Sequence, residues 1–293
     1  MFTKKFFYII LLVFVIALLG SCNFSRAAAE QEAPLEESYP EETKPDETKG
    51  VEAQKFEFNH SISKFANESA EPERSVTVFE KTYSMKYGRS WEHPLFPWVV
   101  INEYLTDTDN TFSFFDQTGE VMSMSIPYNP ADIGEKIDEK AAEQTARWIM
   151  EEYVKDADAY RLKSLMYNDS GSYYIYYYRY LGDMLTSDFI SITLEKDGTF
   201  SSFVYYAPIC ADIDPAKYAE KFKQDDLYLQ KLADFTRAEH GDEFVSLDVE
   251  DKYLSRNTSG EVIVVYKIGI QLKSGEYCDR GDPGIYYFVL DEV

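Results

Sequence analysis

Residues 188–206 carry the pattern that most constrains the fold, because they read as two half-buried strands joined by a tight turn. Ile190, Ile192 and Leu194 alternate with polar residues, and this period of two is typical of a strand with one buried face. Residues 196–198 (Lys-Asp-Gly) supply the turn, since glycine accepts positive φ at little cost and Asp-Gly is a frequent hairpin dipeptide. The segment therefore predicts an antiparallel hairpin.

The same arrangement recurs along the chain. Residues 111–126 form an earlier strand–turn–strand pattern, in which Gly119 takes the place of Gly198. Apolar residues in strand-like patterns predict further strands. We expect strands at residues 75–85, 98–106, 111–115, 120–126, 160–167, 172–181, 188–194, 199–206, 244–254, 261–272 and 285–290.

Two helical regions separate these groups of strands. Residues 138–154 have apolar residues at helical spacing, and Asp138 is a suitable N-cap. Asp214-Pro215 opens a second helical region, since proline at the first helical position removes no hydrogen bond. Residues 224–226 interrupt its apolar stripe, which predicts two short helices.

These elements predict an α+β fold of tandem units, each a helix followed by an antiparallel sheet. We expect a signal peptide (residues 1–21), a disordered acidic tether (22–55), an N-terminal and mostly β partial unit (56–134), and two units of a helix with three or four strands (135–207 and 208–293), the second without a closing strand.

These two units resemble the PepSY-type modules of exported bacterial proteins. The resemblance lies in residues 141–152 on the helix and residues 190–200 on the hairpin, with an acidic-glycine turn before the last strand. It implies a non-catalytic regulator that modulates envelope proteases. A cystatin-like or other sheet-on-helix fold would leave the same pattern, and a fold does not fix a function.

The N-terminus has the features of an export signal. Lys4 and Lys5 precede an apolar run over residues 6–19, which is too short to span a bilayer as a helix. Residues 19–22 (Leu-Gly-Ser-Cys) resemble the lipobox of bacterial lipoproteins. The resemblance implies lipidation of Cys22 and a location on the extracytoplasmic face of the cell membrane. An ordinary secretory signal with an incidental cysteine is the alternative.

The net negative charge of the chain argues against nucleic acid as a partner. Without residues 1–21 the chain has 27 basic and 52 acidic side chains, a net charge of about −25. Nucleic-acid binding needs clusters of lysine and arginine, and the sequence has none. Residues 22–55 are acidic, rich in proline and poor in apolar residues, so they cannot bury enough surface to offset the entropy of ordering.

The sequence offers no catalytic or metal-binding motif. It lacks the G-x-S-x-G and H-E-x-x-H patterns and a phosphate-binding glycine loop. We therefore expect no enzyme activity, no cofactor and no metal. Cys210 and Cys278 form an even pair in an exported chain, and both a disulfide and two buried thiols fit that spacing.

Tyrosine supplies the candidate binding face. Tyr174, Tyr176, Tyr178 and Tyr180 fall on one side of a predicted strand. Cross-strand packing explains such a row, and so does an exposed recognition surface. The first hypothesis for function is a lipid-anchored protein that binds and regulates an envelope protein or peptide. The alternatives are a lipoprotein that binds carbohydrate or another small ligand on the tyrosine face, and an envelope hydrolase with paired carboxylates.

Overall fold

The computed structural model describes residues 52–55, 64–108, 110–274 and 284–290. This part of the chain contains one largely antiparallel 14-stranded sheet and three α-helices, so the predicted α+β class is confirmed. The predicted signal peptide, Cys22 and Cys278 lie outside the described residues.

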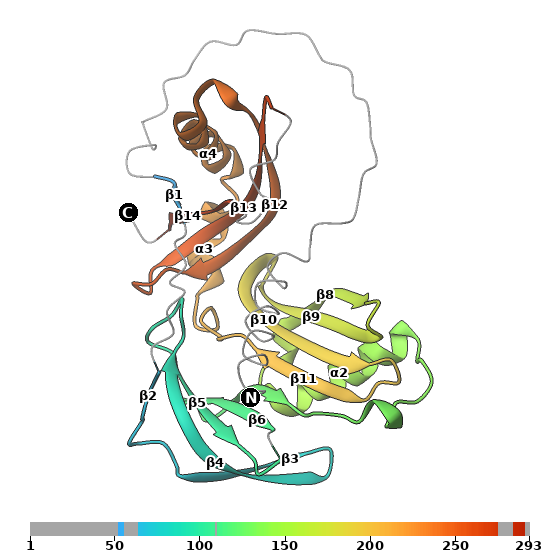
Figure 1. Ribbon diagram of the computed structural model, residues 1–293. Helices are drawn as coiled ribbons and strands as arrows, with labels where there is room; N and C mark the ends of the chain where they lie inside the picture. The colour runs from blue at the N-terminus through green and yellow to red at the C-terminus, as the bar shows by residue number, and fades with distance from the viewer. Residues whose placement is uncertain (1–51, 56–63, 109, 275–283, 291–293) are drawn as a thin grey trace.

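The sheet runs through all three groups of strands in the order β1-β14-β13-β12-β10-β11-β7-β6-β5-β4-β2 (Figure 1). Three strands lie off this path: β3 pairs with β4, β9 pairs with β10, and β8 pairs with β9. Its strands are β1 (Gln54–Lys55), β2 (Lys64–Phe65), β3 (Glu73–Val78), β4 (Lys81–Glu92), β5 (Val100–Leu105), β6 (Thr111–Phe115), β7 (Val121–Ser125), β8 (Tyr160–Tyr167), β9 (Ser172–Leu181), β10 (Met184–Glu195), β11 (Phe200–Tyr205), β12 (Phe244–Arg256), β13 (Val262–Leu272) and β14 (Gly284–Val289).

The helices are α2 (Glu139–Tyr153), α3 (Pro215–Phe222) and α4 (Asp225–His240). Asp138 caps α2, since its carboxylate accepts from the Ala141 N–H at 2.7 Å. Asp214 caps α3 with Pro215 at the first position, and the expected interruption falls between α3 and α4. The predicted helix starts are therefore confirmed.

The hairpin β10–β11 is fixed to the start of α2 through its turn. Gly198 has φ +87°, as the Asp-Gly signal predicts. The Asp197 carboxylate accepts from the backbone N–H groups of Gly134 at 2.8 Å and Thr199 at 2.9 Å. A Cβ atom at Gly198 would lie 3.0 Å from Ile137 Cδ1, so glycine also allows close packing there.

One turn is repeated in the two C-terminal groups of strands. Between β8 and β9, the Asn168 side chain accepts from the Ser172 N–H at 3.0 Å. Between β12 and β13, Asn257 accepts from the Glu261 N–H at 3.0 Å. Gly171 and Gly260 take the positive-φ position in the two turns. The same local chemistry thus opens the long strand in each group.

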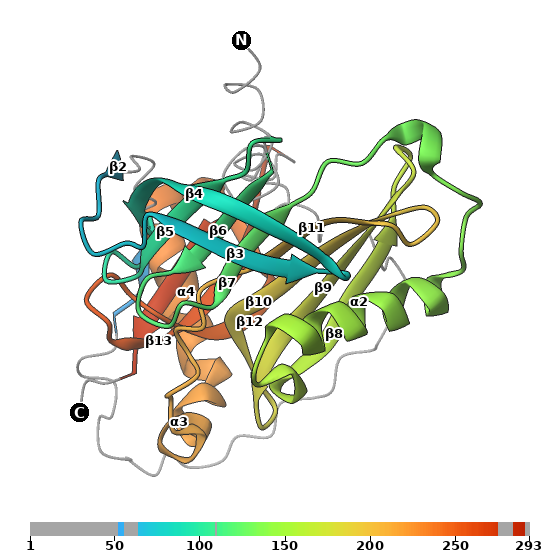
Figure 2. The same cartoon turned by 90° about the horizontal axis from the view of Figure 1, so that it is seen from below.

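The strand expected at residues 75–85 is wrong, because two strands occupy this range. β3 and β4 form a hairpin in which Val78 pairs with Lys81, and Phe79 (φ +49°) and Glu80 (φ +65°) make the turn. Positive φ is uncommon for such residues, so the sequence carried no turn signal. The Phe79 ring packs 5.3 Å from Trp148 on α2 and 5.3 Å from Phe200, which places the hairpin tip against the helix. Figure 2 shows the hairpin reaching toward α2.

Candidate functional site

From β8 to β5 the sheet has one apolar face and one face rich in tyrosine, serine and threonine, because side chains alternate along most of each strand. The face that packs against α2 and the β3–β4 hairpin holds one apolar cross-strand row: Leu165, Ile175, Ile192, Phe203, Met124, Phe112 and Tyr104. All of these except Leu165 are fully buried. α2 contributes Ala142, Ala146, Ile149 and Met150 to the same core. Such alternation is typical of an antiparallel sheet with one packed face.

The opposite face, here named the open face, carries tyrosines and small hydroxyl residues. Its two cross-strand rows are Met166-Tyr174-Thr193-Ser202-Ser125-Thr111 and Ser164-Tyr176-Ser191-Val204-Ser123-Ser113. In Figure 1 this face of β8–β11 is turned to the viewer and α2 lies behind the strands. The face spans strands from both the N-terminal and the middle groups, which the sequence had placed in separate units.

The predicted tyrosine row lies on the open face. Tyr174, Tyr178 and Tyr180 are half-buried, and Tyr176 is buried. Tyr173 and Tyr177 point the other way, since their hydroxyls donate to the backbone carbonyls of Ile137 and Glu143 beside α2. The tyrosines of β9 thus alternate between the two faces of the sheet, and α2 lies on the face opposite the row.

A carboxylate lies at one border of the row. Glu195 is 5% exposed and accepts from the Ser172 hydroxyl at 3.1 Å. Burial and a hydrogen bond to Glu195 raise the pKa of Tyr128, whose ring is 39% exposed. Tyr128, Tyr174 and Glu195 thus bring two aromatic rings and one acceptor together at the edge of the open face.

A stack of aromatic rings closes the other end of the row. Phe189 stacks on Tyr178 at 5.5 Å and on Tyr206 at 4.8 Å. His93 meets Tyr206 edge-on at 4.9 Å, and burial lowers the pKa of His93 to about 3. The neutral ring therefore acts as an aromatic packing residue, and the stack ties β9 and β10 to the loop after β4.

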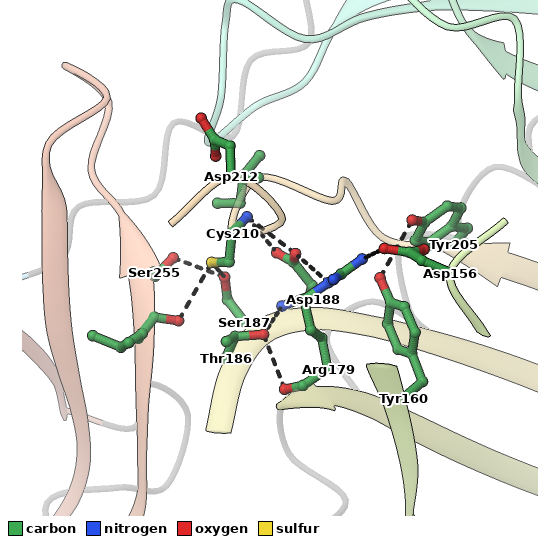
Figure 3. Close-up of polar contacts among 12 residues, drawn as sticks. Asp156, Tyr160, Arg179, Thr186, Ser187, Asp188, Tyr205, Cys210, Asp212 and Ser255 are labelled. Carbon is green, nitrogen blue, oxygen red and sulfur yellow. Dashed lines mark hydrogen bonds and ion pairs between the residues drawn. The ribbon is translucent and has the colours of Figure 1, made fainter. Parts of the chain in front are cut away.

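Below the open face, a buried ionic cluster joins β9, β10 and the segment before α3 (Figure 3). Arg179 forms ion pairs with Asp156 and, at 3.4 Å between Nε and Oδ2, with Asp188. The Arg179 side chain is 5% exposed, Asp188 is fully buried, and the guanidinium lies 4.9 Å from the Tyr160 ring centre. A buried cation is thus held between two carboxylates and an aromatic face.

Cys210 adds a second contact between these elements. Its backbone N–H donates to both Asp188 oxygens, at 3.2 and 3.0 Å. The Cys210 Sγ lies 3.7 Å from both the Ser187 hydroxyl and the Leu254 carbonyl oxygen. The Ser255 hydroxyl donates to Ser187 at 2.9 Å. These contacts hold β12 against β10, where the two strands pair in parallel through Thr186 and Leu254.

The shifted pKa values of Cys210 and Asp188 fit a structural role for this cluster, which joins β9, β10 and β12. Burial raises the pKa of the Cys210 thiol well above its ordinary value, so the thiol stays protonated and weakly nucleophilic. Burial also raises the pKa of Asp188 to about 7, against the opposing effects of the Cys210 N–H and Arg179. Asp188 can therefore take up a proton near neutral pH, which would weaken its ion pair with Arg179.

Replacing Asp188 by asparagine is expected to change how stability depends on pH. The folded protein holds a proton on Asp188 more tightly than the unfolded chain, whose pKa is about 4. The stabilisation is complete below about pH 4 and is lost as the pH rises to about 7, at up to about 1.4 kcal/mol per pH unit. Asp188→Asn removes this dependence, so its stability relative to wild type should rise across that range.

Urea unfolding at a series of pH values measures this difference. Asp212→Asn is the matched control, because Asp212 is exposed and pairs with Arg256 at 3.0 Å. Its stability should differ from that of wild type by no more than about 1 kcal/mol, as is usual for an exposed ion pair. Parallel pH profiles for Asp188→Asn and wild type would contradict the assignment.

Within the described ranges, no group of three or more His, Cys, Asp or Glu residues could hold a metal ion. No helix among those residues is long and apolar enough to cross a membrane. A shallow depression of about 380 Å³ lies on α2, lined by Lys140, Glu143, Gln144, Arg147, Trp148 and Glu151.

Comparisons with known proteins identify no relative by sequence. No protein-family model matches the chain, and no curated protein matches it. Among solved structures, the "Bacillus megaterium YpeB C-terminal domain" aligns with 76% of this chain and 91% of its own, at 10% identity and a TM-score of 0.32. The fold class stated above stands on the strands and helices themselves.

The structure brings together residues that the sequence analysis did not connect. The sequence predicted neither the hydroxyl residues of the open face nor the Arg179–Asp188 pair. The alternation of residues along β9 and β10 could have identified this pair. It places Arg179 on the same face as Ile175 and Tyr177, and Asp188 on the same face as Ile190. Among the described residues Cys210 is a buried free thiol, and Cys278 lies outside them, so the disulfide and the two-thiol alternatives both stay predictions.

Proposed function

We propose that this chain is a non-enzymatic binding protein that holds an envelope protein or peptide on its open face. The observation that supports it is the composition of that face: half-buried tyrosines beside rows of serine and threonine, on the side of the sheet away from α2. Tyrosine supplies contact area at low entropic cost, and small hydroxyl residues supply adaptable hydrogen bonds.

The shape of the face favours a macromolecular partner. Small-molecule sites are concave and enclose most of their ligand. The rows on β9, β10, β11 and β7 instead follow an extended sheet surface, which suits a partner that presents an area of its own. The resemblance to PepSY-type modules implies a regulatory outcome, and the lipobox resemblance implies a lipid anchor at Cys22 on the extracytoplasmic side of the membrane.

Site-specific photocrosslinking in cells that express the chain tests this proposal. A photoreactive residue at position 174 or 202 should give a reproducible protein adduct, whereas one at Gln144, on the exposed side of α2, should give none. Tyr174→Asp should lower the yield from position 202 by roughly tenfold, since an aromatic anchor at an interface contributes about 1–2 kcal/mol. Equal adducts from both sides of the sheet, or none from the open face, would contradict the proposal.

A further inference from the structure

The described part of the chain buries four charged side chains: Arg179, Asp188, Glu195 and Lys267. Three of them have an ionic partner, since Arg179 pairs with Asp188, and Lys267 Nζ lies 2.9 Å from the Glu250 carboxylate. Glu195 is the exception, because no lysine or arginine in the described ranges forms an ion pair with it. Glutamate is almost never fully buried without such a pair, so the unpaired carboxyl group of Glu195 calls for an explanation.

Two neutral hydroxyl groups contact the Glu195 side chain. The Ser172 hydroxyl donates to Oε2 at 3.1 Å, and the Tyr128 side chain forms the second hydrogen bond. A carboxylate has about four acceptor positions, so these two donors leave about half of them unused. Neutral donors also leave its charge uncompensated, because a buried carboxylate is balanced by a cation. Glu195 therefore keeps both the hydrogen-bonding capacity and the charge to hold a cation.

Glu195 lies at the border of the open face, beside two tyrosine rings. It is opposite Ser172 in the β9–β10 pairing, two residues beyond the Tyr174–Thr193 pair and on the same side of the sheet. Tyr174 is half-buried and the Tyr128 ring is 39% exposed, so both rings offer area to a partner. The face of a tyrosine ring attracts a cation, most strongly where water is excluded. We name Tyr128, Tyr174 and Glu195 the aromatic corner.

The two cross-strand rows of the open face contain no charged side chain. They consist of tyrosine, serine, threonine, methionine and valine. Such residues bind through shape, neutral hydrogen bonds and aromatic contact, so they do not select a charged group. Glu195, at the border of the rows, is the group that can discriminate a cationic side chain from a neutral one. The chain as a whole, with a formal net charge of −23, attracts basic partners over longer distances.

We propose that the aromatic corner receives an arginine or lysine side chain of the protein segment held on the open face, and that Glu195 selects it. The proposal rests on the proposed function and adds the chemistry of one contact that the partner must supply. The alkyl part of such a side chain packs on the tyrosine rings while its charged end faces Glu195. A metal ion fits less well, since it needs about six oxygen ligands, and the described ranges contain no group of three acidic, histidine or cysteine residues that could hold one.

Small-molecule probes test the aromatic corner without a partner protein. The probe is N-acetyl-arginine methylamide, and N-acetyl-citrulline methylamide is its uncharged counterpart of nearly the same shape. 3-Fluorotyrosine at position 174 of the purified full-length chain reports binding through its fluorine NMR signal. The arginine compound should bind about tenfold more tightly than the citrulline compound, because charge-assisted hydrogen bonds are roughly twice as strong as neutral ones and the rings attract the cation.

Glu195→Gln removes the charge but keeps the shape of the side chain and one oxygen that accepts hydrogen bonds. In this variant the arginine and citrulline compounds should bind about equally. Asp183→Asn is the matched control, because Asp183 is exposed in the turn between β9 and β10 and its replacement changes the net charge by the same amount. This control should keep the preference for arginine, which separates the corner from a general effect of the acidic chain.

Photocrosslinking from position 202 connects the corner to the partner. Glu195→Gln should lower the yield of protein adduct about tenfold, whereas Asp183→Asn should leave it unchanged. Equal binding of the two compounds to the wild-type chain, or binding of neither, would overturn the proposal, and so would an adduct yield that Glu195→Gln does not lower. Absence of any adduct from the wild-type chain would refute the proposed function, and the two compounds would then decide the corner alone. That comparison needs no variant at position 195, so a folding defect there cannot affect it.

Discussion

Replacing Arg179 by methionine is expected to lower the free energy of unfolding by about 3–5 kcal/mol at about pH 8. Arg179 is 5% exposed and is the cation that faces Asp188, which is fully buried. Without the guanidinium, the buried carboxylate keeps the hydrogen bonds from the Cys210 N–H but loses the cation that faces it. An uncompensated buried charge is among the costliest defects a fold can carry.

The stability that Arg179→Met loses should be larger at high pH than at low pH. The pKa of Asp188 is already raised to about 7, and loss of the nearby cation raises it further. At about pH 5 the carboxyl group is protonated and needs no counter-ion, so Arg179→Met should lose less than half as much stability there. Adding Asp188→Asn to Arg179→Met should restore part of the loss at pH 8, since replacing both members of a buried pair avoids the unpaired charge.

Thermal unfolding at the two pH values measures both effects, and the first corresponds to a fall in Tm of roughly 10 °C. Arg237→Met is the control, because Arg237 pairs with Asp234 at 3.1 Å and both side chains are 59% exposed. Exposed pairs contribute about 0–1 kcal/mol. A loss for Arg179→Met that is as small as the control, or that does not change with pH, would contradict the role assigned to the cluster.

Local sequence signals predicted most of the elements. β6, β8 and β9 occupy the expected residues, because each is a run of alternating or apolar residues bounded by Asn, Asp, Ser or Gly. The Phe79–Glu80 turn was not predicted, because neither residue normally adopts positive φ. Its geometry is set by contacts of Phe79 with Trp148 and Phe200, which lie far along the chain.

The long-range strand pairings could not be predicted from the sequence for a different reason. β7 joins β11, β12 joins β10, and β1 joins β14 through backbone hydrogen bonds that no side-chain pattern encodes. The open face depends on the first of these contacts, because Ser202 and Val204 on β11 meet Ser125 and Ser123 on β7. The tyrosine row could be derived from one strand, whereas the hydroxyl rows appear only when the register across several strands is known.

Replacing Cys22 by serine is expected to move nearly all of the protein from the membrane to the soluble fraction. The lipobox resemblance implies a diacylglyceryl group on the Cys22 sulfur. Each buried methylene contributes about 0.8 kcal/mol, so two or more chains anchor stably while one is marginal. Cell fractionation measures the shift, and Cys278→Ser is the control that should stay membrane-bound. Retention of Cys22→Ser in the membrane would contradict lipid anchoring.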